Sequence, residues 1–140
     1  KVKSYGEADI ANYLAMNGIP YVYEEAYCVD TSDSDHGRYN PDFHISGTNI
    51  YIEYFGIDRD QNVAPFMVDA DPDARRHYLE GMEWKRNVHR ENGTVLVELF
   101  AYDRSEGLLM QKLEEFVEQY NLEKNPISPE VVFERMIGSD

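Results

Sequence analysis

Apolar and polar residues recur along the chain with two different periods, and these periods predict its secondary structure. Residues 4–18 carry apolar side chains at helical spacing and end at a glycine, so they predict an amphipathic helix. Residues 19–27 are rich in tyrosine and valine and predict a strand. The following segment, CVDTSDSDHG over residues 28–37, has the composition of a loop.

The second half of the pattern predicts a hairpin and then alternating helices and strands. Asp71 is a suitable N-cap for a helix that ends at Asn92-Gly93, and the near-continuous apolar run after it indicates a central strand. The expected elements after the loop are two strands within 38–57 separated by SGTN, a loop over 58–70, a helix over 71–92, a strand over 94–102, a helix over 107–122 and a short helix over 128–137. The order αβββαβα predicts an α/β fold, with a mixed sheet of about four strands flanked by helices, in a single domain.

Two carboxylates interrupt the apolar pattern of the hairpin. If the turn is formed by Gly47 and Thr48 as a type II′ turn, partners across the hairpin have numbers that sum to 95, and Asp42 lies directly opposite Glu53. Both side chains then project from the same face of the sheet, with β-carbons roughly 5 Å apart. Two like charges at this distance need a proton, a cation or a metal ion between them. A hard ion such as Mg²⁺ is one solution, and a sheet edge where both acids reach water is the alternative.

The charge balance modifies this interpretation. Acidic residues outnumber basic residues 27 to 13, and the net charge of −14 argues against a general nucleic-acid binder, because phosphate contacts need Lys and Arg. A local patch can nevertheless bind a polyanion. Six basic side chains fall in the predicted helix over 71–92: Arg75, Arg76, Lys85, Arg86, His89 and Arg90.

Three simple features set the expected context. No apolar run approaches the roughly 18 residues of a membrane span, which argues against a membrane partner. The single cysteine, Cys28, excludes an internal disulfide and favours a reducing, cytoplasmic location. The first residue is Lys1 rather than methionine, so we expect the 140 residues to be a domain taken from a longer chain.

The strings NPDF and IYIEYFG resemble the core of the PD-(D/E)xK nuclease superfamily, which has Pro-Asp on one strand and an acid on the next. The wider pattern is similar to the nuclease-like module of UvrD/Rep-type, helicase IV-like DNA helicases. The matching segments are VKSYGEADIANYL, YNPDFHI, IYIEYFGID, YLEGMEWKRNVHRENGTVLVE and SPEVVFERM. The resemblance implies a restriction-endonuclease-like core, Mg²⁺ or Mn²⁺ as the cofactor, DNA as the substrate, and helicase domains of the same chain as partners.

The resemblance also implies roles for individual residues. Asp42, Glu53 and the carbonyl group of Tyr54 are expected to hold the metal ion. The superfamily usually has a lysine two residues after the second acid, where this chain has Phe55. Similar families take the lysine from the following helix, and Lys85 fits that position.

An acid on the first helix completes the expected catalytic set, and Glu7 matches it. A capping box is the alternative, in which Glu7 bonds back to the amide of Ser4. On the helix over 71–92, four residues are expected to contact DNA, and a solvated helix face is the alternative there. They are Tyr78, Arg86, His89 and Arg90.

The sequence therefore predicts a metal-dependent deoxyribonuclease domain that hydrolyses phosphodiester bonds as part of a DNA helicase or repair protein. The alternative is a catalytically inactive module that guides DNA or docks a partner. A small-molecule hydrolase has little support, because the chain has no nucleophile elbow, no glycine-rich phosphate loop and no Cys/His metal cluster.

Overall fold

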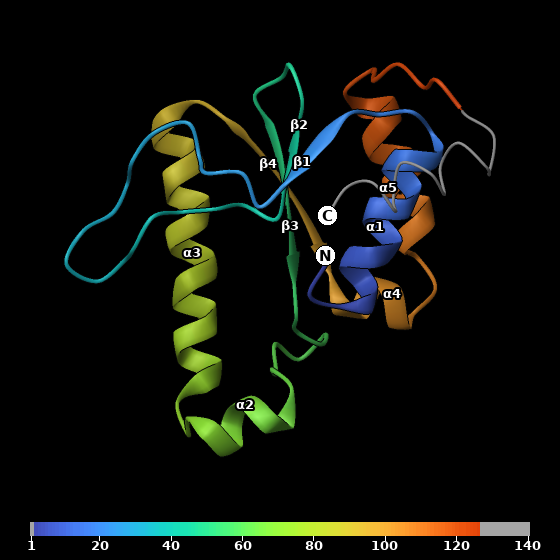
Figure 1. The fold of residues 1–140 in the computed structure, drawn as a ribbon. Coiled ribbons are helices and arrows are strands. Elements are labelled where there is room, and N and C mark those ends of the chain that lie inside the picture. Colours follow the sequence, from blue (N-terminus) through green and yellow to red (C-terminus); the bar gives the residue numbers. More distant parts are fainter. Residues whose placement is uncertain (1, 127–140) are drawn as a thin grey trace.

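Helices and strands alternate in the computed structural model, which describes residues 2–126 (Figure 1). The helix predicted over residues 128–137 lies outside the described residues. Within residues 2–126, no helix combines the length and the apolar character that a bilayer crossing requires. The elements are, in chain order, α1 (Tyr5–Met16), β1 (Tyr21–Tyr23), β2 (Phe43–Ile45), β3 (Ile50–Phe55), α2 (Pro65–Ala70), α3 (Ala74–Asn92), β4 (Val95–Phe100), α4 (Ala101–Ser105) and α5 (Leu109–Gln119).

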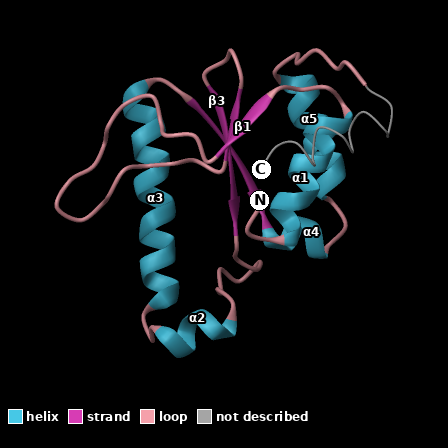
Figure 2. Ribbon diagram, viewed as in Figure 1, coloured by secondary structure: helices cyan, strands magenta, loops and turns pink. Residues whose placement is uncertain are grey.

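The four strands form one mixed sheet in the order β1-β2-β3-β4. The first three strands are antiparallel neighbours, and β4 runs parallel to β3 after the crossover through α2 and α3. Figure 2 shows the sheet nearly edge-on, with α1, α4 and α5 on one side and α3 on the other. The predicted α/β fold with a four-stranded mixed sheet flanked by helices is confirmed.

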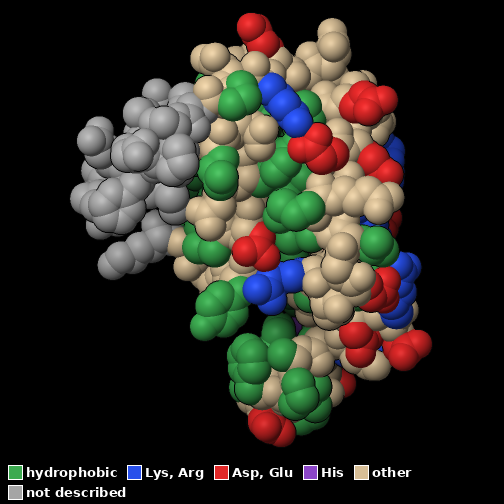
Figure 3. All heavy atoms as spheres, turned by 90° about the vertical axis from the view of Figure 1, so that its right-hand side faces the viewer, with side chains coloured by type: hydrophobic (Ala, Val, Ile, Leu, Met, Phe, Trp, Pro, Cys, Tyr) green, Lys and Arg blue, Asp and Glu red, His purple; other side chains and the backbone are tan. Residues whose placement is uncertain are grey.

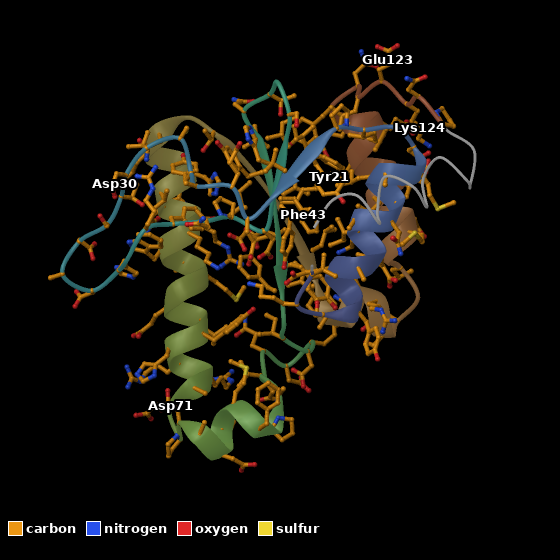
Figure 4. All side chains as sticks on the ribbon, viewed as in Figure 1. Tyr21, Asp30, Phe43, Asp71, Glu123 and Lys124 are labelled. Atoms are coloured by element: carbon orange, nitrogen blue, oxygen red, sulfur yellow. The ribbon has the colours of Figure 1, made fainter. Side chains whose placement is uncertain are left out.

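The predicted register of the hairpin is also confirmed, since Phe43 pairs with Ile52 and His44 pairs with Tyr51. Side chains alternate between the two faces of a strand, so this register decides which residues meet which helix layer. Phe43 and Ile52 belong to the apolar cluster under α1 and α5, whereas Tyr51 packs with residues of α3. Figure 4 shows Phe43 together with Tyr21 of β1 on the side of the sheet that faces α1.

The turn of the hairpin differs from the predicted one. The N–H of Thr48 donates to the carbonyl of Ile45 at 3.2 Å, so the turn closes around Ser46 and Gly47 rather than Gly47 and Thr48. Gly47 has φ 76°, the left-handed value that glycine tolerates best. The strands keep the predicted register, and Thr48 and Asn49 separate this turn from the first residue of β3.

Strand β4 lies at an edge of the sheet and not at its centre, which corrects the prediction made from its apolar run. Its side chains are covered on both faces: Leu99 packs in the cluster with α5, and Phe100 packs in the cluster with α3. A continuous apolar pattern therefore reports two covered faces, and it does not report how many strands lie beside β4.

The segment between β3 and α3 contains a helix that the hydrophobic pattern does not predict. Helix α2 has six residues and none of them is buried; Phe66 is 72% exposed. Its exposed apolar side chains lie at the lower end of the molecule in Figure 3. Asp71 ends α2 by donating its N–H to the carbonyl of Met67, so α3 begins three residues later than predicted, at Ala74.

Candidate functional site

Asp42 and Glu53 lie together on the α3 side of the sheet. Glu53 is in β3, and Asp42 directly precedes β2, one step beyond the observed pair Phe43 and Ile52. Both carboxyl groups are buried, with residue exposures of 6% for Asp42 and 1% for Glu53. One oxygen of Asp42 accepts the N–H of Tyr54 at 2.7 Å. The predicted pair of neighbouring carboxyl groups is therefore present and is shielded from water.

The burial of this pair has an electrostatic consequence. Desolvation raises the pKa of Asp42 to about 7, and the neighbouring carboxyl of Glu53 adds to this effect through charge repulsion and a shared hydrogen bond. The N–H of Tyr54 and the charge of Lys85 act in the opposite direction. Asp42 thus takes up a proton near neutral pH, which is one of the solutions that buried like charges require.

Glu53 is held by one neutral donor and one cation. Its Oε2 accepts the hydroxyl of Tyr39 at 2.6 Å, and its Oε1 lies 3.5 Å from Nζ of Lys85. The ring of Phe55 lies beneath the same ammonium group, 5.7 Å from Nζ to the ring centre. The side chain of Lys85 therefore reaches Glu53 from α3, across the ring of Phe55.

Glu7 approaches the pair from the start of α1. It is 5% exposed, and its carboxylate accepts the hydroxyl of Tyr23 at 2.5 Å and the N–H of Lys3 at 3.4 Å. Ser4 caps the helix by accepting the N–H of Glu7 at 3.1 Å, but Glu7 bonds to Lys3 rather than to the amide of Ser4. Desolvation and the charge of Asp42 raise the pKa of Glu7 against the effect of Tyr23. Only half of a capping box is formed, and the carboxylate faces the site.

Lys3 is a site residue that the sequence did not single out. Its Nζ lies 2.9 Å from Glu24 and 3.9 Å from Asp42. The hydrogen bond with Glu24 raises the pKa of Lys3 against desolvation, and the charges of Asp42 and Glu7 strengthen the rise. No spacing along the chain connects these residues. Only the fold of the N-terminal segment over β1 brings them together.

A close approach between α1 and β3 fixes where Glu7 lies. A β-carbon at Gly6 would stand 2.0 Å from Cζ of Tyr54 and 2.2 Å from its hydroxyl oxygen. The tyrosine ring therefore occupies the space that any larger residue at Gly6 needs. This contact brings the first turn of α1, and with it Glu7, against the strand that carries Glu53.

The oxygen ligands of the pair suit a hard divalent cation, but they are few. Among residues 2–126, no three His, Cys, Asp or Glu side chains are grouped so as to hold a metal ion. Glu7 is directed at Tyr23 and Lys3, which leaves Asp42 and Glu53 as the pair available. Mg²⁺ is commonly bound through one or two carboxylates with water in the remaining positions. The two carboxyl groups fit that mode of binding.

Two residues of α3 expected to contact DNA are already engaged within the protein. The hydroxyl of Tyr78 accepts the N–H of Gly56 at 2.7 Å, which ties α3 to the end of β3. The guanidinium of Arg86 donates to Glu98 of β4 at 2.9 and 2.7 Å and to Glu83 at 3.2 Å. Arg86 therefore joins α3 to the edge strand, and its charge is balanced there.

His89 and Arg90 lie in contrasting places. His89 is 2% exposed, and desolvation together with the charge of Lys85 lowers its pKa to about 4. A buried, neutral imidazole contacts no DNA, which corrects the expectation for His89. Arg90 is exposed on the last turn of α3, where it donates to the side chain of Asn87.

A hollow of about 420 Å³ lies between α2 and α3. Its walls are mostly apolar and include Phe66, Met67 and Tyr78, with His77 and Asp71 hydrogen-bonded to each other at 2.6 Å at one side. Tyr78 also bonds to Gly56, three residues after Glu53, so it connects the hollow to the neighbourhood of the acidic pair.

Comparisons of the chain with protein-family models, with curated proteins and with solved structures each gave no match. The site itself combines two buried carboxyl groups, a third beside them, and ammonium groups that approach from the N-terminal segment and from α3.

Proposed function

We propose that the domain binds Mg²⁺ or Mn²⁺ through Asp42 and Glu53 and hydrolyses phosphodiester bonds in DNA. The observation that carries the proposal is the buried pair of carboxyl groups, with Nζ of Lys85 3.5 Å from one of them. Burying two acids side by side costs free energy unless a proton or a cation compensates them. A fold that keeps such a pair beside a lysine has the parts of a hydrolytic metal site.

The charges around the acidic pair favour the binding of a divalent cation. Glu7, Asp42 and Glu53 bring three acidic groups, and Lys3 and Lys85 bring two ammonium groups. Glu24, 2.9 Å from Lys3, is a fourth acid, so two negative charges are left over when all six groups are ionised, and an added dication brings the site to neutrality. A neutral site lowers the local repulsion that the net charge of −14 would otherwise exert on phosphates.

The bound ion would supply a water molecule of lowered pKa and neutralise charge that develops on the phosphate oxygens. The side chains of this domain would hold and orient the reacting groups. Glu53 and Asp42 would bind the ion, and the carbonyl of Tyr54 would join them as the resemblance implies. Lys85, with a side chain 34% exposed, would donate to a phosphate oxygen while it remains next to Glu53.

The hollow beside Tyr78 supports a nucleic-acid substrate. It offers apolar and aromatic walls, with Phe66 largely exposed, and aromatic side chains provide stacking surfaces for bases. Tyr78 of this surface bonds to the N–H of Gly56, three residues after Glu53, so a DNA strand bound at the acidic pair would extend toward the hollow. The proposal therefore includes a base-stacking role for Phe66.

Cleavage of labelled single- and double-stranded DNA with Mg²⁺ or Mn²⁺ tests the proposal. We expect the parent to cut and Asp42→Asn, Glu53→Gln and Lys85→Ala to lose activity. Lys112→Ala is the matched control, because Lys112 also lies beside a buried acid, with Nζ 2.8 Å from Asp103, and beside aromatic rings, but in another part of the fold. Equal cleavage by all variants would indicate a contaminating nuclease.

A non-catalytic module that guides DNA or docks helicase domains is the second candidate. The engagement of Arg86 by Glu98 and Glu83 favours it, because few cations of α3 remain free for a polyanion. Calorimetry with Mn²⁺ separates the two candidates. The nuclease site should release heat that Asp42→Asn abolishes, whereas a docking module should show no such heat.

A further inference from the structure

A chain of hydrogen bonds runs from Glu53 through buried side chains of the protein. The hydroxyl of Tyr39 donates to Oε2 of Glu53 at 2.6 Å and also lies 3.0 Å from Nε2 of His89. Nδ1 of His89 lies 2.8 Å from Oγ1 of Thr94, and this oxygen lies 2.5 Å from the hydroxyl of Tyr27. Five side chains from distant parts of the sequence are thus linked in series.

The chemistry of these groups decides which atom donates in each bond. Tyr39 has one proton, which it gives to Glu53, so Nε2 of His89 must carry a hydrogen and donate to the phenol oxygen. The low pKa of His89 keeps the imidazole neutral, so Nδ1 has no proton and accepts from Thr94. Thr94 then has no proton left for Tyr27, and Tyr27 donates to Thr94.

Every donor in the chain therefore points toward Glu53. Hydrogen bonds aligned in one direction polarise one another, and the last donor in the series becomes the strongest. The chain is shielded, because Tyr27 is 0%, Tyr39 5% and His89 2% exposed. The ring of Tyr51 closes the cluster around His89 at 5.3 Å between ring centres. In such a setting an aligned donor is well suited to hold a carboxylate in one orientation.

We propose that Tyr39 and His89 are positioning residues, which hold the carboxylate of Glu53 in the orientation that a divalent cation requires, through an ordered chain of hydrogen bonds that starts at Tyr27. This inference rests on the proposed function. It explains why a histidine stands at residue 89 although it cannot reach DNA: it sets the direction in which Tyr39 donates. Outer partners that orient a ligand commonly change metal affinity by 10- to 100-fold when they are removed.

Calorimetry with Mn²⁺ measures the effect of Tyr39→Phe, which removes the hydroxyl and keeps the ring. We expect the dissociation constant for Mn²⁺ to rise about 10-fold or more. Tyr51→Phe is the matched control, because its ring lies in the same cluster and its hydroxyl is outside the chain of hydrogen bonds; its affinity should equal that of the parent. Tyr27→Phe should cause a smaller loss than Tyr39→Phe, because Tyr27 is three bonds further from Glu53.

Kinetics distinguish positioning from a general structural defect. Under subsaturating Mn²⁺, Tyr39→Phe should lower kcat for DNA cleavage and leave KM for DNA unchanged, and excess Mn²⁺ should restore most of kcat. A variant that had only lost stability would not recover in this way. Equal Mn²⁺ affinity in Tyr39→Phe and the parent would overturn the inference and leave the proposed nuclease function standing.

The tautomer of His89 is a second measurement that does not depend on activity. Long-range ¹H–¹⁵N correlation of the imidazole at pH 7 should show the neutral form with the proton on Nε2. A proton on Nδ1, or a doubly protonated ring, would reverse the order of donors and overturn the inference. If the parent neither binds Mn²⁺ nor cleaves DNA, the proposed function fails first and the positioning role fails with it.

Discussion

Replacing Asp42 by asparagine tests the electrostatic argument for the site, because the amide keeps the shape of the side chain and cannot ionise. The pKa of Asp42 is about 7 in the folded protein against 3.8 for the unperturbed carboxyl. Between about pH 4 and pH 7 the folded protein holds a proton that the unfolded chain has released. The contribution of Asp42 to the free energy of unfolding of the parent therefore falls as pH rises through this window.

The size of the effect follows from the two pKa values. One pKa unit corresponds to about 1.4 kcal/mol, so a difference of about three units makes the ionised Asp42 cost roughly 4 kcal/mol of stability above pH 7. Asp42→Asn lacks this cost. Relative to the parent, the variant should therefore gain up to about 4 kcal/mol between pH 4 and pH 8.

The lowered pKa of His89 makes the free energy of unfolding change with pH in the opposite direction. The effect of Asp42 is therefore measured as the difference between the parent and Asp42→Asn. Its pKa is lowered from 6.5 to about 4, so the unfolded chain binds a proton below pH 6.5 that the folded protein excludes. Stability is fully present above pH 6.5 and is lost as pH falls toward 4, by roughly 3 kcal/mol. In the parent the two effects oppose each other in this range, whereas Asp42→Asn keeps the rise caused by His89 and lacks the fall caused by Asp42.

Urea denaturation at pH 5, 6, 7 and 8 measures both profiles. The single tryptophan, Trp84, provides a fluorescence signal. Trp84 stacks on the ring of His36, with 4.1 Å between the ring centres, so its fluorescence also reports this local contact. Far-UV circular dichroism therefore provides a second probe of unfolding. Saturating Mn²⁺ at pH 8 should stabilise the parent, by about 2.7 kcal/mol at 100 times its dissociation constant, and should not stabilise Asp42→Asn. Parallel pH profiles for the two proteins would refute the reasoning.

Three further predictions concern the surroundings of the site. Gly6→Ala should destabilise the fold by about 1–3 kcal/mol in thermal or urea denaturation, because the added β-carbon would overlap the ring of Tyr54. Gly81→Ala, in open space within α3, should instead stabilise the fold by up to about 1 kcal/mol, and equal effects of the two substitutions would contradict the close approach at Gly6. Arg86→Gln should lower stability by about 1 kcal/mol through the loss of its pair with Glu98 and leave the heat of Mn²⁺ binding unchanged; a loss of DNA cleavage without a loss of stability would instead return Arg86 to the substrate. Phe66→Ala should weaken binding of single-stranded DNA at least 5-fold in fluorescence anisotropy at fixed salt and leave Mn²⁺ binding intact, and unchanged DNA affinity would remove the stacking role.

Local patterns predicted the features of the site that depend on periodicity. A strand alternates its faces every two residues, so the hairpin sequence was enough to place Asp42 and Glu53 on one side and Phe43 on the other. The helix over α3 was recognisable from its pattern and from Gly93, which has φ 70° at its C-terminal end. The assignment of Lys85 to the acidic pair came from the family resemblance rather than from periodicity, and Nζ of Lys85 lies 3.5 Å from Oε1 of Glu53.

Other features depend on contacts between residues far apart in the chain, which no local period encodes. Tyr39 and His89 are 50 positions apart, Tyr27 and Thr94 are 67 apart, and their hydrogen bonds exist only after α3 has packed on the sheet. Burial likewise depends on contacts between distant residues. It lowered the pKa of His89 and raised the pKa of Asp42, although the sequence shows only a polar residue at each position. By itself the sequence therefore determined which side chains share a face, because that depends on backbone geometry. Only the tertiary structure decided which of those side chains are buried, hydrogen-bonded or charged, because these properties depend on the residues that pack against them.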